Sequence, residues 1–235
     1  MISYFGDKRW KEITRDERYF CAELYQQIKH PEKTKDFVKF LKDAASPIEG
    51  FDNDFSLLDE TKYWDIGYEV CFYRDMLFYC QNILSIRDFN KGKAKKDCFP
   101  EKRTFDLCLF SDDEIVIIEA KAQQGLHRGQ NEKFQKDKEF VLQLFQQMKI
   151  EKVPKIYLVV LASSKYFKSP SFKSSAGVGK ELINSNKAPE NKGDQYLLGF
   201  VSWEQLSFLE EIGNELKSCF KRADSLYGEK AEKPR

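Results

Sequence analysis

The stretch 104–124, TFDLCLFSDDEIVIIEAKAQQ, constrains the fold more than any other part of the chain. Two short apolar runs flank a polar turn, which is typical of a β-hairpin. Side chains alternate between the two faces of a strand, so Asp106 would share a face with the apolar residues two and four positions later. The same alternation places Glu119, Lys121 and Gln123 in a row at the end of a strand that is otherwise apolar.

Charged groups are costly at such a place unless they pair, bind a metal or act on a ligand. One interpretation is a simple salt bridge between Glu119 and Lys121 at the frayed end of an edge strand. However, Asp106 on the paired strand can converge on the same point, which favours a functional site. Two carboxylates suit a hard divalent cation, and a lysine beside them suits the orientation or activation of a water near a phosphate.

Asp106, followed on the next strand by Glu119-Ala120-Lys121, resembles the core motif of the PD-(D/E)XK nuclease superfamily, which has the restriction-endonuclease-like fold. The proline of the family name is absent, because Phe105 precedes Asp106, but that position varies widely in the family. Gln123 also resembles a polar position of several branches. The bare motif is common by chance. Its value comes from its context, with the acid on one apolar strand, the Glu-x-Lys on the next, and a helix after.

The resemblance implies an α/β fold with a mixed central sheet, an antiparallel hairpin plus a parallel strand, flanked by helices. Asp106 and Glu119 would hold one or two Mg²⁺ ions, for which Mn²⁺ can substitute, together with the carbonyl of residue 120. Lys121 would position or deprotonate the attacking water, and Gln123 would orient the lysine, the water or a ligand. The implied activity is phosphodiester hydrolysis by an endonuclease, in DNA rather than RNA.

Two other classes of function stay open at this point. One is a nucleic-acid-binding module of the same fold that is catalytically inactive or cleaves only with a partner. The other is a structural scaffold in which Glu119 and Lys121 merely pair.

Two glutamates are candidates for an additional acid. Glu17 lies in a helix predicted over 14–29, where the sequence TRDE favours a capping box with Thr14 as N-cap, or else aims Glu17 at the site. Glu69 lies near the edge of the apolar stripe of a long helix predicted over 65–85. Superfamily members often draw an acid from a helix before the hairpin. The alternative is a glutamate that pairs with a lysine or caps its own helix. The sequence does not choose between the two acids.

The remaining pattern predicts further elements on either side of the hairpin. A helix and a short β-branched strand after the hairpin form a crossover unit, which would set this strand parallel to the one that carries Glu119. The expected elements are a helix over 36–45, an irregular connection over 46–60, the hairpin turn over 111–114, a helix over 131–149, strands over 155–163 and 196–201, and a helix that begins with the capping box SWEQ at Ser202 and ends near Lys221.

Two lysine-rich stretches, 90–103 and 164–180, could grip a phosphate backbone. The aromatic residues of the second stretch could also stack on bases. The alternatives are a solvated charged face for the first and a surface loop for the second. The lysines concerned are Lys93, Lys95, Lys96, Lys165, Lys168 and Lys173.

With 235 residues, the chain is expected to form one domain, with a helical elaboration over 1–60, a nuclease-like core over 65–221 and a polar tail over 225–235. Lysine plus arginine (39) nearly equals aspartate plus glutamate (38), so any affinity for a polyanion must come from local patches, and a homodimer or a partner subunit would help.

Six cysteines without a CxxC pair and only two histidines argue against a disulfide framework and a zinc site. The sequence shows neither a secretory signal nor a window long and apolar enough for a membrane span, so the expected location is the cytoplasm.

Overall fold

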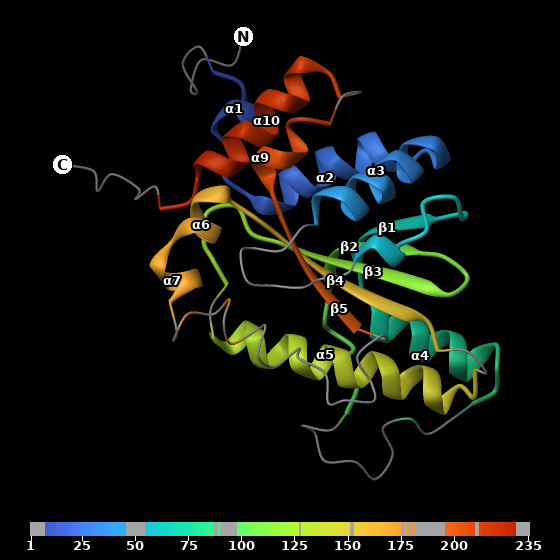
Figure 1. Cartoon of the computed structure of the whole chain (residues 1–235). Helices are drawn as coiled ribbons and strands as arrows, with labels where there is room; N and C mark the ends of the chain where they lie inside the picture. The colour runs from blue at the N-terminus through green and yellow to red at the C-terminus, as the bar shows by residue number, and fades with distance from the viewer. Residues whose placement is uncertain are drawn as a thin grey trace.

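A single five-stranded sheet organises the chain, in the order β1-β2-β3-β4-β5 (Figure 1). The strands are β1 Asp65–Val70, β2 Phe105–Phe110, β3 Glu114–Ala120, β4 Lys155–Ala162 and β5 Tyr196–Ser202. The pairs β1-β2 and β2-β3 are antiparallel, whereas β3-β4 and β4-β5 are parallel. The computed structural model describes residues 8–45, 55–86, 89, 98–126, 128–150, 153–174, 177, 179, 181, 196–209 and 212–228. The mixed α/β sheet expected from the sequence is therefore confirmed.

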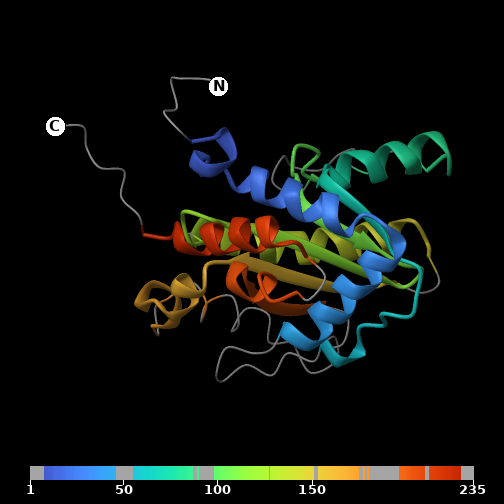
Figure 2. The same ribbon diagram turned by 90° about the horizontal axis from the view of Figure 1, so that it is seen from above.

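Helices cover both faces of this sheet (Figures 1 and 2). One face carries α4 (Phe72–Asn82) and α5 (Arg128–Gln147), and the other carries α2 (Glu17–Ile28), α3 (Pro31–Ala44) and α10 (Asn214–Ser225). The short helices are α1 (Trp10–Ile13), the 3-10 turn η2 (Phe55–Leu57), α6 (Ser164–Lys168), α7 (Pro170–Lys173) and α9 (Trp203–Leu206). The N-terminal helices α2 and α3 thus share one face of the sheet with the C-terminal helix α10.

Alternation along β3 divides the core into two layers. Val116 and Ile118 pack under α2, α3 and α10, whereas Ile115 and Ile117 pack against α4 and α5. All seven residues of β3 are buried, as expected for a central strand with helices on both sides. The predicted division of the hairpin between two faces is confirmed.

The elements from the hairpin to β5 follow the sequence pattern closely. The hairpin is β2 and β3, although Glu114, assigned to the turn, already belongs to β3. The helix predicted over 131–149 is α5, and the strands predicted over 155–163 and 196–201 are β4 and β5. The crossover through α5 sets β4 parallel to β3, as predicted.

The long helix predicted over 65–85 is wrong in its first part, because residues 65–70 form β1. Their apolar residues fit a helical stripe, but Ile66 and Tyr68 also alternate, and β2 offers this segment a paired edge. Glu69 has a φ of 52°, a left-handed conformation that an α-helix does not accommodate. The helix begins only at α4, after Cys71.

The predicted capping box at Thr14 is also wrong. Thr14 ends α1, and the N-cap of α2 is Asp16, whose side chain accepts a hydrogen bond from the backbone N–H of Arg18. Thr14 and Asp16 are both good capping residues two positions apart, and packing of α2 on the sheet selects the second. Glu17 therefore occupies the first turn without a reciprocal capping bond. The helix expected over 36–45 likewise begins earlier, with Pro31 at its first position.

Two further expectations near the C-terminal end need correction. The capping box of Ser202 and Gln205 is present, but α9 is short and a separate helix, α10, follows with Gly213 as N-cap. The stretch 164–180 contains α6 and α7 rather than only a loop. Its aromatic residues cannot stack on bases, because Tyr166, Phe167 and Phe172 are buried in the core.

Several predictions lie wholly or largely outside the described residues: most of the connection over 46–60, the lysines of 90–97 and most of the tail over 225–235. Among the helices that the structure does describe, none has the length and apolar character that a bilayer crossing requires.

Gly199 on β5 tests the packing between the sheet and the N-terminal segment. A Cβ at this position would lie 2.6 Å from the ring of Phe55 and 3.2 Å from Ala45. Phe55 is itself buried, so we expect Gly199→Ala to lower the free energy of unfolding by about 1–3 kcal/mol. Urea unfolding measures this change. In a Phe55→Leu background the cost should become much smaller, and an equal cost in both backgrounds would contradict this packing.

Candidate active site

The two carboxylates of the predicted motif meet across β2 and β3. The register pairs Leu107 with Ile118, which places Asp106 beside Glu119 on the neighbouring strand. The Oδ2 atom of Asp106 accepts a hydrogen bond of 2.7 Å from the backbone N–H of Ala120. This hydrogen bond within the hairpin therefore fixes Asp106 relative to the residue that follows Glu119.

Glu119 is buried, with 5% of its surface exposed, and a cation contacts each of its oxygens. Lys121 Nζ lies 3.3 Å from Oε1, and the Nη2 atom of Arg103 lies 3.3 Å from Oε2. The salt bridge between Glu119 and Lys121 is thus present, but it is one part of a larger cluster.

The pKa of Asp106 is far above the usual value for an aspartate. Burial, followed by the nearby charge of Glu119, raises the pKa of Asp106 to about 7, although the N–H of Ala120 and the ammonium of Lys121 act in the opposite direction. Near neutral pH this carboxyl group therefore exchanges between its protonated and ionised forms.

The backbone at Lys121 is held by strand β4 on one side and by the first residue of α9 on the other. Its N–H donates to the carbonyl of Leu161 at 2.7 Å, and its carbonyl accepts a hydrogen bond of 3.0 Å from the indole of Trp203. The ammonium donates to the carbonyl of Ala120 at 2.6 Å and to Glu17 Oε1 at 3.3 Å.

Lys121 stays charged in this environment. Burial acts to lower its pKa, but the carboxylates of Glu119, Glu17 and Asp106 together outweigh burial and raise the pKa of Lys121. A protonated lysine can position a water or offset negative charge, but it cannot remove a proton. Of the two roles considered for Lys121, the structure therefore favours the electrostatic one.

The structure distinguishes the two additional acids. Glu17, at the start of α2, contacts the ammonium of Lys121, so it joins the cluster. The register of β1 and β2 brings Glu69 level with Asp106, but the Glu69 carboxylate pairs with Arg18 at 3.2 Å. Glu69 therefore lies on strand β1 and not on the helix that the sequence predicted.

Gln123 has a different partner from the one expected. Its side-chain amide donates a hydrogen bond of 2.7 Å to the carbonyl of Arg15, just before α2. It therefore ties the loop after β3 to the N-terminal segment. This contact closes one side of a cavity of about 540 Å³, which is lined by Arg15, Asp16, Glu17, Lys121, Gln123, Gln124, Gly125 and Gln130.

The lysines predicted to contact nucleic acid divide into two groups. Lys93, Lys95 and Lys96 lie outside the described residues. The second group, Lys165, Lys168 and Lys173, is exposed on α6 and α7. The helix α6 follows β4 directly, and Lys121 follows β3 directly. Because β3 and β4 are parallel, α6 and α7 lie beyond the same end of the strands as Lys121 (Figure 1).

Sequence reasoning missed Arg103 and Asp137 as members of the cluster. Arg103 contacts both Glu119 and Asp137, at 3.3 and 3.1 Å. The signal for Asp137 was present, since it lies at helical spacing between the inward residues Phe134 and Val141 of α5. An acid within an apolar helical stripe needs a buried partner.

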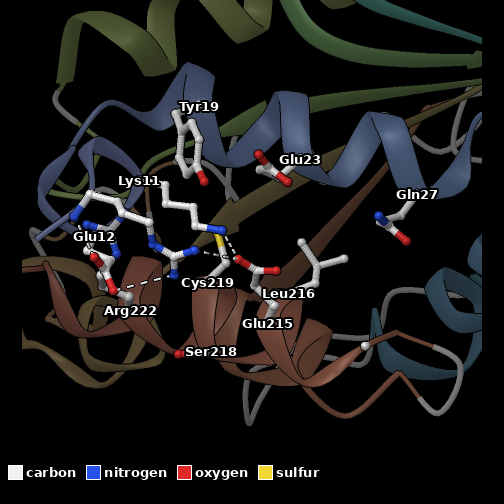
Figure 3. A pocket seen from close by; sticks show the side chains of 12 residues that line it. Lys11, Glu12, Tyr19, Glu23, Gln27, Glu215, Leu216, Ser218, Cys219 and Arg222 are labelled. Carbon is white, nitrogen blue, oxygen red and sulfur yellow. Dashed lines mark hydrogen bonds and ion pairs between the residues drawn. The ribbon is translucent and has the colours of Figure 1, made fainter. Parts of the chain in front are cut away.

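A larger cavity, of about 790 Å³, lies elsewhere, between α1, α2 and α10. Figure 3 shows Tyr19, Glu23 and Gln27 of α2 on one wall and residues of α10 opposite. Glu215 pairs there with Arg9, at 3.8 Å, and with Lys11. This cavity holds none of the predicted site residues, so its size does not make it the candidate site.

In comparisons with known proteins, no family model, no curated protein and no solved structure matches this chain.

Proposed function

We propose that this chain is a metal-dependent nuclease that hydrolyses phosphodiester bonds, in DNA in preference to RNA. The observation that carries the proposal is the charge of the buried cluster. Among the described residues, four carboxylates, Asp106, Glu119, Asp137 and Glu17, face two cations, Arg103 and Lys121, which leaves a net charge of −2 when all are ionised.

A proton on Asp106 is one way to reduce this excess charge, and a bound cation is the other. The available donors, the carboxylates of Asp106 and Glu119 and the carbonyl of Ala120, are hard oxygen ligands. Within the described ranges, no group of three or more His, Cys, Asp or Glu residues is arranged to hold a metal. Mg²⁺ does not need such a group, since it is commonly held by one or two carboxylates with waters and substrate phosphates. The residues present therefore fit Mg²⁺ or Mn²⁺.

In this proposal Lys121 stabilises the transition state. Its ammonium, held beside Glu119 and the Ala120 carbonyl, would offset the charge that develops on the phosphorus-bound oxygens. The chemistry that a bound Mg²⁺ supplies is polarisation of a phosphoryl oxygen and a water that ionises more readily. The reaction consumes one water and breaks one P–O ester bond, which yields a phosphomonoester and an alcohol.

The cavity beside Lys121 and the lysines of α6 and α7 would guide the substrate in this proposal. The cavity is lined by Arg15 and several amide side chains, and the exposed lysines offer sequence-independent contacts to phosphates.

A second candidate, a nucleic-acid-binding module that is inactive or needs a partner, is favoured by one observation. Both oxygens of Glu119 are already paired with cations, so an added ion has to compete with them. Metal binding separates the two proposals, because an inactive module of this kind should bind no Mn²⁺.

Alanine substitutions test the activity directly. We expect Asp106→Ala, Glu119→Ala and Lys121→Ala each to lower Mg²⁺-dependent cleavage by at least about a hundredfold, because each removes a group that would bind the ion or stabilise the transition state. The assay compares plasmid, linear duplex, single-stranded DNA and RNA, each with Mg²⁺, Mn²⁺ or chelator. Lys155→Ala, at the opposite end of β4, is the matched control and should cleave normally. Undiminished cleavage by Lys121→Ala would exclude this mechanism.

The charge excess also predicts how stability depends on pH. The pKa of Asp106 is raised from 3.8 to about 7 in the folded chain, so the folded state binds more protons than the unfolded state between these values. Its contribution to stability is complete below pH 4 and is lost as the pH rises through 7. Without metal, Asp106→Asn should therefore be more stable than the original chain at pH 8, by up to about 4 kcal/mol, and should lose this advantage near pH 4. Urea unfolding at both pH values measures the difference, and an advantage that does not depend on pH would contradict the assignment.

Metal binding should release protons from the same group. Near neutral pH we expect protons to be released as the ion binds, because the raised pKa of Asp106 keeps part of this group protonated there. Calorimetric titration with Mn²⁺ in two buffers of different ionisation enthalpy measures this release. The affinity should increase from pH 6 to pH 8, whereas binding that is unchanged over this range would contradict a site that includes Asp106.

A further inference from the structure

Arg103 occupies an unusual position for a charged residue just before a strand. Its side chain is only 16% exposed, and it lies between two acids from different elements. Its Nη2 atom is 3.3 Å from Glu119 of β3 and 3.1 Å from Asp137 of α5, and its Nε also donates to Asp137, at 3.1 Å. The guanidinium therefore bridges the central strand and the crossover helix.

The guanidinium is also held by contacts other than those to the two acids. It lies over the rings of Phe105 and Phe134, with its central carbon 5.0 and 5.9 Å from the ring centres. Asp137 is held in turn by the hydroxyl of Tyr73, which donates to Oδ1 at 3.0 Å. A flexible cation would stabilise Glu119 in many orientations, whereas a guanidinium held in this way restricts where the contacted oxygen of Glu119 can lie.

We propose that Arg103 is a positioning residue, which holds the Glu119 carboxylate in the orientation in which it can bind a divalent cation together with Asp106. This inference rests on the proposed metal-dependent function. A carboxylate that binds a metal is normally fixed by hydrogen-bond partners of its own, and loss of such a partner commonly weakens metal binding about 10–100-fold. Lys121, at the edge of the cavity, contacts one oxygen of Glu119, and Arg103, in the core, fixes the other.

The network allows positioning to be separated from charge. Arg103→Met combined with Asp137→Leu removes one positive and one negative group, so the net charge of the cluster stays the same. Tyr73→Phe completes the variant, because it removes the hydroxyl that would otherwise lose the carboxylate of Asp137 and keep only a longer bond to the backbone carbonyl. Replacement of a buried ion pair by apolar groups of similar size often preserves stability, so this triple variant should fold.

Calorimetric titration with Mn²⁺ tests the proposal. We expect the triple variant to bind Mn²⁺ at least about tenfold more weakly than the original chain, with a similar urea midpoint. Equal affinity in the two proteins would overturn the role of Arg103 while leaving the proposed function intact. Failure of the original chain to bind Mn²⁺ would overturn the proposed function, and the inference with it.

Lys62→Met is the matched control for a general loss of stability. Lys62 pairs with Glu114, which is as deeply buried as Glu119 but lies at the opposite end of β3. This substitution should lower the urea midpoint without a change in the affinity for Mn²⁺. A loss of affinity in Lys62→Met equal to that in the triple variant would show that destabilisation alone explains the effect, which overturns the proposal.

A second measurement does not depend on metal. Arg103→Met is compared in the original chain and in a Glu119→Gln background by urea unfolding. If Arg103 holds the Glu119 carboxylate, the shift of the midpoint should be clearly smaller in the Glu119→Gln background, because the charged partner is absent. Equal shifts in both backgrounds would overturn the contact on which the proposal depends, even if the triple variant did not fold.

Discussion

Burial of Glu119 at the end of the central strand is the constraint on which the rest of the site depends. An isolated carboxylate is too costly in such a place, so its neighbours must supply positive charge from several directions. Lys121 supplies it from just after the end of β3, and Arg103 from the loop before β2. Arg103 brings its own counter-ion, Asp137, and this carries the electrostatic network into the crossover helix. Burial of Glu119 on β3 thereby requires charged side chains on three other segments.

The parallel part of the sheet explains why these groups can be held so firmly. The ends of β3, β4 and β5 lie at one edge, so the chain that leaves β3 forms hydrogen bonds to both following segments, through Leu161 and Trp203. In open sheets of this kind, ligands commonly bind outside the carboxyl ends of the parallel strands. The cavity that includes Lys121 lies at this edge, where loops are free to vary but the strand ends are fixed.

The sequence predicted the parts of this arrangement that depend on local pattern. Two apolar runs joined by a polar turn were sufficient for the hairpin, and a β-branched run after a long helix was sufficient for β4. The sequence prediction was wrong where the same residues fit two patterns. The apolar positions of β1 fit both a helix and a strand, and only the pairing with β2 decides between them. The sequence also could not join Arg103 to Asp137, because they are 34 residues apart and meet only through the crossover.

The free energy that it costs to bury these charges favours a functional site over a structural one. A scaffold would gain stability from apolar side chains at these positions, since buried ion pairs rarely stabilise a fold more than hydrophobic packing does. Here the imbalance is greater than a structural pair requires, because Asp106 lies beside Glu119 and shares the cation Lys121 with it, and burial raises the pKa of Asp106 to about 7. Proteins tolerate such local conflicts mainly at functional sites, where a ligand resolves them. A salt bridge between Glu119 and Lys121 alone would explain the lysine, but it would leave Asp106 without a reason to be there.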